Sequence, residues 1–189
     1  MNGLLIVFSA PSGAGKTTII NALRDRFPGK YTYSISATTR LPRKHEKSGV
    51  DYYFLSEDEF AQKIENNEFV EWAPVHTYRY GTLKSKIEEQ IAAGEKVIFD
   101  LDVKGALAIK EQFPKISLLI FIAPVSIEVL KERLQKRGTE TEEQIRKRLE
   151  RYVLEMEQSS QFDHLVVNDD LDKTVENVIS IVLDFEKKY

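Results

Sequence analysis

The segment Ala10–Thr17 reads Ala-Pro-Ser-Gly-Ala-Gly-Lys-Thr and carries residues suited to phosphate binding. It follows the apolar run Leu4–Phe8 and opens a helical pattern, which is the context that a P-loop requires. Glycines let successive backbone N–H groups turn toward phosphate oxygens, and the start of a helix adds partial positive charge there. The predicted nucleoside triphosphate site comprises Ala10, Pro11, Ser12, Gly13, Ala14, Gly15, Lys16, Thr17 and Thr18.

Individual positions of this segment carry separate expectations. Lys16 reaches the β- and γ-phosphates, and the Thr17 hydroxyl is a ligand for Mg²⁺. Thr18 is expected mainly to pack the helix. Ala10 replaces the first glycine of the usual pattern, and alanine fits there if its φ angle is negative. The alternative interpretation is a glycine-containing turn with an incidental lysine.

Two arginines, Arg40 and Arg43, lie three residues apart in a loop that follows an apolar run. Two guanidinium groups can clamp one phosphate bidentately, and the Ser36 hydroxyl can add a donor. This pattern predicts a second phosphate site, for an acceptor molecule. The alternative is a solvated surface loop.

Tyrosines and one glutamate follow in Asp51–Phe54, Phe69–Trp72 and Tyr80–Thr82. Tyrosine hydroxyls can reach a phosphate or a base, although ordinary aromatic packing explains them equally well. Glu71 is an acceptor-only group, and guanine presents an adjacent N1–H and N2–H₂ pair that a carboxylate can bind. Adenine has no such pair. The alternative for Glu71 is a solvated charge in an edge strand.

Asp100 and Asp102 come at the end of the apolar run Lys96–Leu101. Ligands of open α/β sheets bind at the carboxyl ends of strands. A carboxylate there can hold magnesium through water, which we assign to Asp100, or a base amine. For Asp102 the alternative is a cap on the following helix.

Arg133, Arg137 and Arg148 flank a turn between two helical patterns. Mobile arginines can close over phosphates, stabilise the charge of the transferred group and exclude water. The alternative is a solvated charged hairpin with pairs such as Glu143–Lys147.

The hydrophobic pattern predicts a scaffold that brings these residues together. Short apolar runs without alternation are typical of a parallel sheet covered on both faces. They are Leu4–Phe8, Tyr31–Ile35, Lys96–Leu101, Ser117–Ile122 and His164–Val167. Helical patterns lie at Lys16–Phe27, Leu83–Ala93, Lys104–Phe113, Ser126–Arg137, Thr141–Ser159 and Asp172–Lys188, and a capping box at Ser56–Glu59 opens another. We predict a three-layer α/β fold with a five-stranded parallel core sheet built around the P-loop.

The interval Thr38–Ile91 is too long for a simple crossover and contains strand-like pieces at Tyr52–Leu55 and Phe69–Val75. We predict an inserted mixed α+β lobe at residues 38–91 that binds the acceptor nucleotide. Residues 1–37 and 92–189 then form the core domain, with a helical lid at about residues 125–155.

The composition limits the classes of function. The chain has 189 residues and a net charge of −3, so no global field attracts nucleic acid or an acidic membrane. It has no cysteine, which excludes disulfides and thiolate metal sites. Gly3–Phe8 is too short to span a bilayer, and no basic leader with a cleavage site precedes it. We expect a cytoplasmic protein without a nucleic-acid or membrane partner.

In its ordered set of motifs, the chain resembles guanylate kinase from residue 3 to residue 188. The matching stretches are Ser9–Thr17, Ser36 with Thr38–Arg40 and Pro42–Arg43, Gly49–Phe54, Asn67–Trp72, Tyr80–Gly81, Asp100–Asp102, Arg137–Glu143 and Val167–Leu171. Two departures leave every predicted contact in place: His76–Arg79 replaces the usual glycine–asparagine–tyrosine approach to Tyr80, and Lys104 stands where glutamine is common.

The resemblance implies particular roles for single residues. The GMP phosphate is held by Ser36, Arg40, Arg43, Tyr52 and Tyr80, and the guanine is read by Glu71, Thr82 and Asp102. The lid supplies Arg137 and Arg148 to catalysis, together with Lys16 and Arg43. Arg133, Asn168 and Asp169 lie beside ATP, although Asn168 and Asp169 also suit a simple turn.

The expected function is therefore Mg²⁺-dependent transfer of the γ-phosphoryl group of ATP to GMP or dGMP in purine nucleotide metabolism, by a monomer or weak homo-oligomer. One rival is another nucleoside monophosphate kinase, against which Glu71 and the two-arginine clamp argue. The other is a guanylate-kinase-like protein-binding module. Such modules typically lose the P-loop, which is intact here at Gly13–Thr17.

Overall fold

The computed structural model describes residues 3–75, 77–137 and 141–189, except for the side chains of Arg133 and Arg137. Its central sheet has five parallel strands in the order β2-β7-β1-β8-β9. The strands are β1 (Leu4–Ser9), β2 (Thr32–Tyr33), β7 (Lys96–Asp100), β8 (Ser117–Pro124) and β9 (His164–Asn168). The prediction of an α/β fold with a five-stranded parallel core sheet is confirmed.

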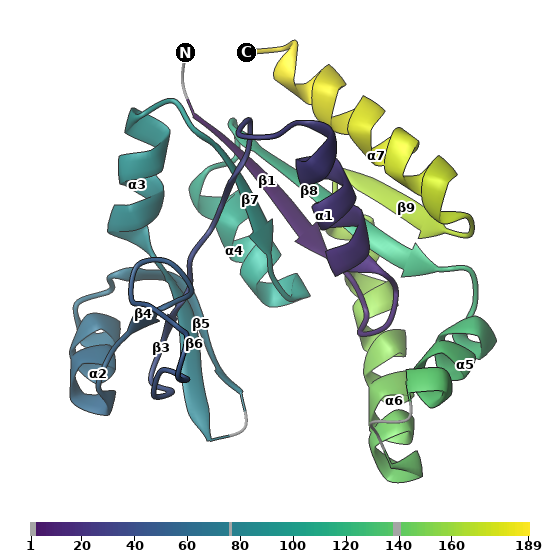
Figure 1. Cartoon of the computed structure of the whole chain (residues 1–189), viewed down its shortest axis with the longest axis horizontal. Helices are drawn as coiled ribbons and strands as arrows, with labels where there is room; N and C mark the ends of the chain where they lie inside the picture. The colour runs from purple at the N-terminus through teal and green to yellow at the C-terminus, as the bar shows by residue number, and fades with distance from the viewer. Residues whose placement is uncertain (1–2, 76, 138–140) are drawn as a thin grey trace.

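Helices cover both faces of this sheet (Figure 1). Helices α1 (Lys16–Arg26) and α7 (Leu171–Glu186) pack on one face, where Ile6, Phe8 and Ile98 are buried. Helices α3 (Lys84–Ala92) and α4 (Val103–Gln112) pack on the other, against residues such as Leu5 and Phe99. Adjacent β1 residues thus point to opposite faces, and burial on both sides explains the unbroken apolar runs.

A second sheet forms the inserted lobe, in the strand order β4-β3-β6-β5. Its elements are β3 (Ala37–Thr38), β4 (Tyr53–Phe54), helix α2 (Glu57–Glu65), β5 (Phe69–Val75) and β6 (Tyr78–Leu83). The Ser56–Glu59 capping box is present at the start of α2. A separate small core contains Ala37, Phe60, Phe69 and Leu83.

The lobe is joined to the core domain through its longest strand. Val70 of β5 is buried in the same cluster as Val103 and Ala106 of α4, and the Gln112 side chain donates to the Val70 carbonyl at 3.2 Å. Helix α3, which falls inside the predicted lobe boundaries, buries Ile87 against the core sheet.

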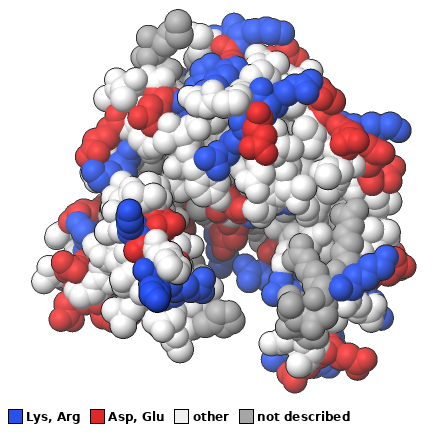
Figure 2. Space-filling view, viewed as in Figure 1, with Lys and Arg blue, Asp and Glu red and all other residues white. Residues whose placement is uncertain are grey.

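Two further helices, α5 (Ile127–Arg137) and α6 (Glu142–Gln158), lie across from the lobe beyond the carboxyl ends of the core strands (Figure 1). Their contact buries Leu130, Leu134 and Ile145. Thr141 caps α6 through a capping box with Gln144. A space-filling view shows a hollow between these helices and the lobe, with basic and acidic side chains along it (Figure 2). A short 3₁₀ turn, Ser159–Gln161, links α6 to β9.

The core of the sheet supplies a stability test. Phe121 of β8 is fully buried and packs edge-on against Phe162, with ring centroids 5.2 Å apart. Phe121→Ala should lower the free energy of unfolding by about 3–5 kcal/mol in chemical denaturation, because a cavity remains in a close-packed core. Leu154→Ala, at a side chain that is 59% exposed, is the control and should change it by less than about 0.5 kcal/mol. Equal effects would contradict this assignment of the core.

Candidate functional site

The loop between β1 and α1, which is the predicted phosphate cradle, lines a cavity of about 600 Å³. Gly13 and Gly15 have φ angles of 97° and 98°, in the left-handed region that favours glycine. Ala14 between them is buried in the core. Ala10 is partly buried, and positive φ angles among the described non-glycine residues occur at Asn67 alone, so alanine is accommodated at position 10.

Close neighbours also require glycine in this loop. A Cβ atom at Gly13 would lie 3.0 Å from the Leu130 side chain of α5. A Cβ at Gly15 would clash with the Asn168 amide, which itself donates to the Ala14 carbonyl at 2.7 Å. The cradle is therefore packed directly against α5 and the end of β9.

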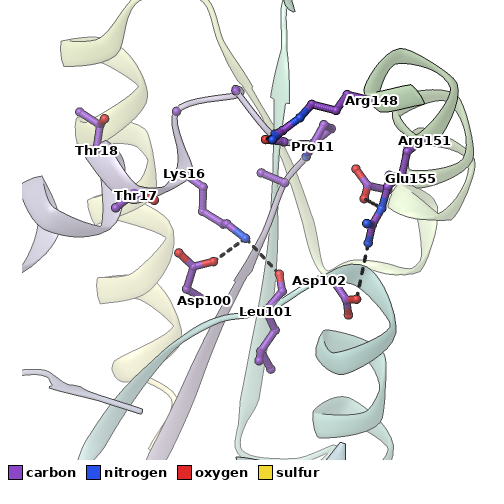
Figure 3. A pocket seen from close by; sticks show the side chains of 14 residues that line it. Pro11, Lys16, Thr17, Thr18, Asp100, Leu101, Asp102, Arg148, Arg151 and Glu155 are labelled. Carbon is purple, nitrogen blue, oxygen red and sulfur yellow. Dashed lines mark hydrogen bonds and ion pairs between the residues drawn. The ribbon is translucent and has the colours of Figure 1, made fainter. Parts of the chain in front are cut away.

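Lys16 projects across the cavity toward the end of β7 (Figure 3). Its ammonium group lies 2.5 Å from Asp100 Oδ1 and donates to the Leu101 carbonyl at 3.1 Å. Both side chains are about one-fifth exposed, so this ion pair is only partly screened by solvent. The pair holds the lysine at the mouth of the cavity, where an incoming anion can exchange with Asp100.

Thr17 and Thr18 are exposed and line the cavity. The prediction that Thr18 mainly packs the helix is wrong, because this face of α1 turns toward the cavities while Ile19 and Ile20 are buried. Thr18 also lines a neighbouring cavity of about 390 Å³, together with Gly13, Gly15, Lys136, Asn168, Asp169 and Leu171. This second cavity brings Asn168 and Asp169 beside the predicted cradle, and it includes Lys136, which the sequence analysis missed.

Helix α6 directs three side chains into the cavity, and of these Arg148 reaches the cradle while Arg151 and Glu155 lie near Asp102 (Figure 3). The Arg148 guanidinium donates to the Ser12 hydroxyl. Arg151 lies 2.9 Å from Glu155 and 3.8 Å from Asp102. The sequence analysis missed Arg151 and Glu155, although their spacing from Arg148 is that of one helical face. Arg133 and Arg137 lie on α5, but their side chains are outside the described residues.

Burial raises the pKa of Glu155 above its ordinary value, and the negative charge of Asp102 acts in the same direction. The positive charges of Arg151 and Lys16 oppose this shift. A carboxylate thus lies between two cations on the wall of a cavity that also contains the cradle.

A smaller cavity of about 250 Å³ lies on the side of the lobe. Its lining includes Ser36 from the segment between β2 and β3, Asp51 and Tyr52 from the lobe, and Asp100 and Leu101 from the end of β7. Asp100 and Leu101 also line the cradle cavity. The two cavities therefore share one wall, at the carboxyl end of a single strand.

The predicted phosphate clamp assembles partly around this smaller cavity. The rings of Tyr52 and Tyr80 meet edge-on with centroids 6.0 Å apart, and the Arg40 guanidinium lies 5.3 Å from the Tyr52 centroid. Arg40, Tyr52 and Tyr80 therefore lie close together, and Ser36 lines the same cavity as Tyr52. The Arg43 side chain is instead exposed to solvent.

The three predicted base readers also converge. Strands β5 and β6 pair Glu71 with Thr82, and the Thr82 hydroxyl donates to Glu71 Oε1 at 2.6 Å. Asp102 caps α4 by accepting from the Gly105 N–H at 2.9 Å, so the helix cap given as the alternative role of Asp102 in the sequence analysis is present. A Cβ at Gly105 would lie 3.3 Å from Glu71 Oε2 and 3.4 Å from Asp102 Oδ1. Both carboxylates therefore border Gly105, a residue that the sequence analysis missed.

Burial raises the pKa of Glu71, and the nearby charge of Asp102 raises it further. The hydrogen bond from Thr82 acts against this shift because it stabilises the carboxylate. The site thus places an acceptor group where water is largely excluded, which suits recognition of paired N–H donors.

Within the described ranges, no group of three or more histidine, cysteine, aspartate or glutamate side chains is arranged to hold a metal. No helix in the same ranges is long and apolar enough to cross a membrane. Of the two departures noted in the sequence, Lys104 lies in the first turn of α4. In the other, the stretch His76–Arg79, Arg79 lies in β6 and pairs with Glu57 at 3.4 Å. His76 lies outside the described residues.

Comparison with known proteins identifies relatives along nearly the whole chain. Residues 2–184 match the guanylate kinase family model. A guanylate kinase from Chlorobium luteolum is 48% identical over 97% of this chain and 92% of its own length. One from Thermotoga maritima is 45% identical over 96% and 87%. A crystal structure of guanylate kinase from Anaplasma phagocytophilum aligns with a TM-score of 0.72 and 30% identity, covering 97% of this chain and 86% of that one.

The environment of Glu71 can be tested by carboxyl ¹³C NMR titration. The pKa of Glu71 should lie above its ordinary value of 4.5. Thr82→Val should raise this pKa further, because it removes the hydrogen bond to the carboxylate. Asp102→Asn should lower it, because it removes a like charge. Shifts of the opposite sign would show that these three side chains do not interact as described.

Proposed function

Because the chain belongs to the guanylate kinase family, we propose that it transfers the γ-phosphoryl group of ATP to GMP, giving ADP and GDP, in purine nucleotide metabolism. The observation that carries this proposal is the shared wall of the two cavities at Asp100 and Leu101. One cavity contains the predicted phosphate cradle, and the other is lined by Ser36 and Tyr52 of the predicted acceptor-phosphate clamp. Their junction supports direct transfer between two nucleotides.

On the donor side, the cradle binds the phosphates of ATP through backbone N–H groups and the start of α1. Lys16 leaves Asp100 to contact the β- and γ-phosphates, and the partly exposed ion pair supports such an exchange. Asn168 and Asp169, which line the neighbouring cavity, lie beside the adenosine part.

Magnesium fits the donor set of this cavity. The Thr17 hydroxyl and the Asp100 carboxylate both line it, and Mg²⁺ prefers oxygen ligands while it keeps several waters. Thr17 would bind the ion directly and Asp100 through water. When bound, Mg²⁺ neutralises charge on the phosphate oxygens.

On the acceptor side, Ser36, Arg40, Arg43, Tyr52 and Tyr80 hold the phosphate of GMP. Glu71 accepts from the guanine N1–H and N2–H₂ groups, with Thr82 and Asp102 beside it. The hydrogen bond between Thr82 and Glu71 supports this role, because it fixes the carboxylate in one orientation. Adenine does not offer this donor pair, so the cluster favours GMP over AMP.

The transfer step needs charge stabilisation and little acid–base chemistry. The nucleophile is a phosphate oxygen of GMP, which is ionised at neutral pH, so no general base is required. Lys16, Arg43, Arg137 and Arg148 stabilise the transferred group. The contact between Arg148 and Ser12 supports a lid, at about residues 125–155, that closes on the cradle and excludes water.

The remaining parts of the proposal concern the whole molecule. Residues 1–37 and 92–189 form the core domain and residues 38–91 the GMP-binding lobe, with α3 at the end of the lobe segment packed on the core sheet. Either GMP or dGMP can serve as acceptor. A cytoplasmic location and a monomer or weak homo-oligomer without a nucleic-acid or membrane partner stay predictions from the sequence.

A substrate panel tests the activity. Purified protein with ATP and Mg²⁺ should form ADP with GMP and much less with AMP or CMP. Lys16→Ala should abolish turnover, with circular dichroism unchanged, because it removes the cation of the cradle. Turnover with AMP or CMP but not with GMP would overturn the substrate assignment.

The role of Glu71 has its own test. Glu71→Gln should raise the GMP KM at least about tenfold, because it removes a charged acceptor, and should leave the ATP KM nearly unchanged. Glu65→Gln, at an exposed residue of α2, is the matched control and should leave both values unchanged. An unchanged GMP KM in Glu71→Gln would refute the role.

The pH profile gives a further check on the same residue. Glu71 binds guanine in its ionised carboxylate form, and its pKa lies above the ordinary value for glutamate. The kcat/KM for GMP should therefore fall as pH decreases through this raised pKa. Titration of the GMP phosphate near pH 6 contributes as well. Only the Glu71 contribution should disappear in Glu71→Gln, and an identical profile in both proteins would contradict it.

A further inference from the structure

Glu46 lies in the loop that leads from the two clamp arginines to strand β4, and its side chain contacts both arginines. Its carboxylate accepts from Arg40 Nη1 and Nη2, both at 2.9 Å. It also accepts from the Arg43 backbone N–H at 2.8 Å, and the Glu46 N–H donates to the Arg43 carbonyl at 3.0 Å. One carboxylate therefore binds the side chain of one arginine and the backbone of the other.

Counting the donors of Arg40 shows which part of the guanidinium is available. A guanidinium has five N–H donors. Glu46 takes one from each Nη atom, and the Leu41 carbonyl takes the second from Nη1 at 2.8 Å. The two donors outside these bonds are Nε–H and the second N–H of Nη2, and the guanidinium also interacts with the side chain of Tyr80, itself a predicted ligand of the same phosphate. These two donors lie parallel on one edge of the group, and this edge matches two oxygens of a phosphate.

The faces of the same guanidinium are also restrained. It lies 5.3 Å from the ring centroid of Tyr52 and 5.8 Å from that of Phe54. Only 13% of the Arg40 side chain and 16% of the Glu46 side chain are exposed. The hydrogen bond to Arg40 is the main reason that the pKa of Glu46 lies below its ordinary value. The pair is therefore ionised and fixed in orientation at neutral pH.

We propose that Glu46 is a positioning residue for the GMP phosphate: it binds the outer edge of Arg40, so that the Nε–Nη2 edge is held ready for phosphate. This inference rests on the proposed role of the clamp. Glu46 does not touch GMP, and its effect passes through Arg40. Orientation before binding lowers the entropy cost of ordering a long side chain.

The proposal predicts that removal of the Glu46 charge weakens GMP binding, whereas simple electrostatics predicts that it strengthens it. A carboxylate near a phosphate site repels the dianion, so its removal should strengthen GMP binding if charge alone mattered. If Glu46 orients Arg40, its removal should weaken GMP binding despite the relief of repulsion. The direction of the change in the GMP KM therefore separates the two explanations.

The experiment measures steady-state kinetics of Glu46→Gln. The GMP KM should rise about tenfold or more, while the ATP KM stays within about twofold. Inhibition by guanosine, which lacks the phosphate, should keep the same inhibition constant. Glu65→Gln again serves as the control for loss of one negative charge in the lobe. A GMP KM that is unchanged or lower in Glu46→Gln would overturn the proposal.

A double-mutant comparison excludes a merely structural role. Arg40→Ala alone should raise the GMP KM, and adding Glu46→Gln to it should cause no further rise. An equal additional rise would overturn the proposal, because Glu46 would then act independently of Arg40. If Glu46→Gln lowers the thermal midpoint strongly, Glu46→Asp replaces it. Aspartate keeps the charge but is too short to contact both the Arg40 guanidinium and the Arg43 backbone N–H. We therefore expect Glu46→Asp to raise the GMP KM without changing the thermal midpoint. An unchanged GMP KM would overturn the proposal.

The same assay separates this inference from the proposed function. If the unmodified protein forms no ADP from ATP and GMP, the proposed function fails. If it does so and Glu46→Gln behaves like the unmodified protein, only the role of Glu46 fails.

Discussion

The ion pair between Lys16 and Asp100 marks the point on which the rest of the structure depends. It joins the phosphate cradle to the carboxyl end of β7, and this strand end forms a wall of both cavities. Two nucleotide phosphates that meet there repel each other strongly, in a chain with a net charge of −3. Local cations must therefore offset this repulsion, and the fold delivers them from three directions: α1, the lobe and α6.

Carboxylates in the same region give these cations defined positions. Asp100 holds Lys16, Glu155 lies 2.9 Å from Arg151, and Glu46 binds the end of Arg40. In the absence of nucleotides, each pairing limits the repulsion among neighbouring positive groups. In the proposed mechanism, substrate phosphates replace Asp100 as the partner of Lys16, while Glu46 keeps Arg40 oriented. Arg148 contacts a neutral partner, the hydroxyl of Ser12, at the edge of the cradle.

Local patterns in the sequence predicted the core sheet and the cradle. Both features depend on residues adjacent in the chain: unbroken apolar runs indicate strands buried on both faces, and a glycine-containing segment between a strand and a helix indicates the cradle. Strands β3 and β6 were missed: β3 has two residues, β6 contains a glycine, and both depend on pairing with distant partners. The contacts of Arg151 and Gly105 were missed for the same reason, since they arise only when α6 and β5 fold against α4. Thr18 was assigned to packing because its sequence position does not reveal which side of α1 faces the cavities.

The most direct test of two nucleotides meeting at the end of β7 is calorimetric binding of a bisubstrate analogue, in which adenosine and guanosine are joined through a polyphosphate chain. The account predicts one analogue per chain and an affinity at least about a hundredfold above that of ATP or GMP alone, because one molecule fills both cavities. An affinity no greater than that of the better single nucleotide, or two analogues bound per chain, would contradict it.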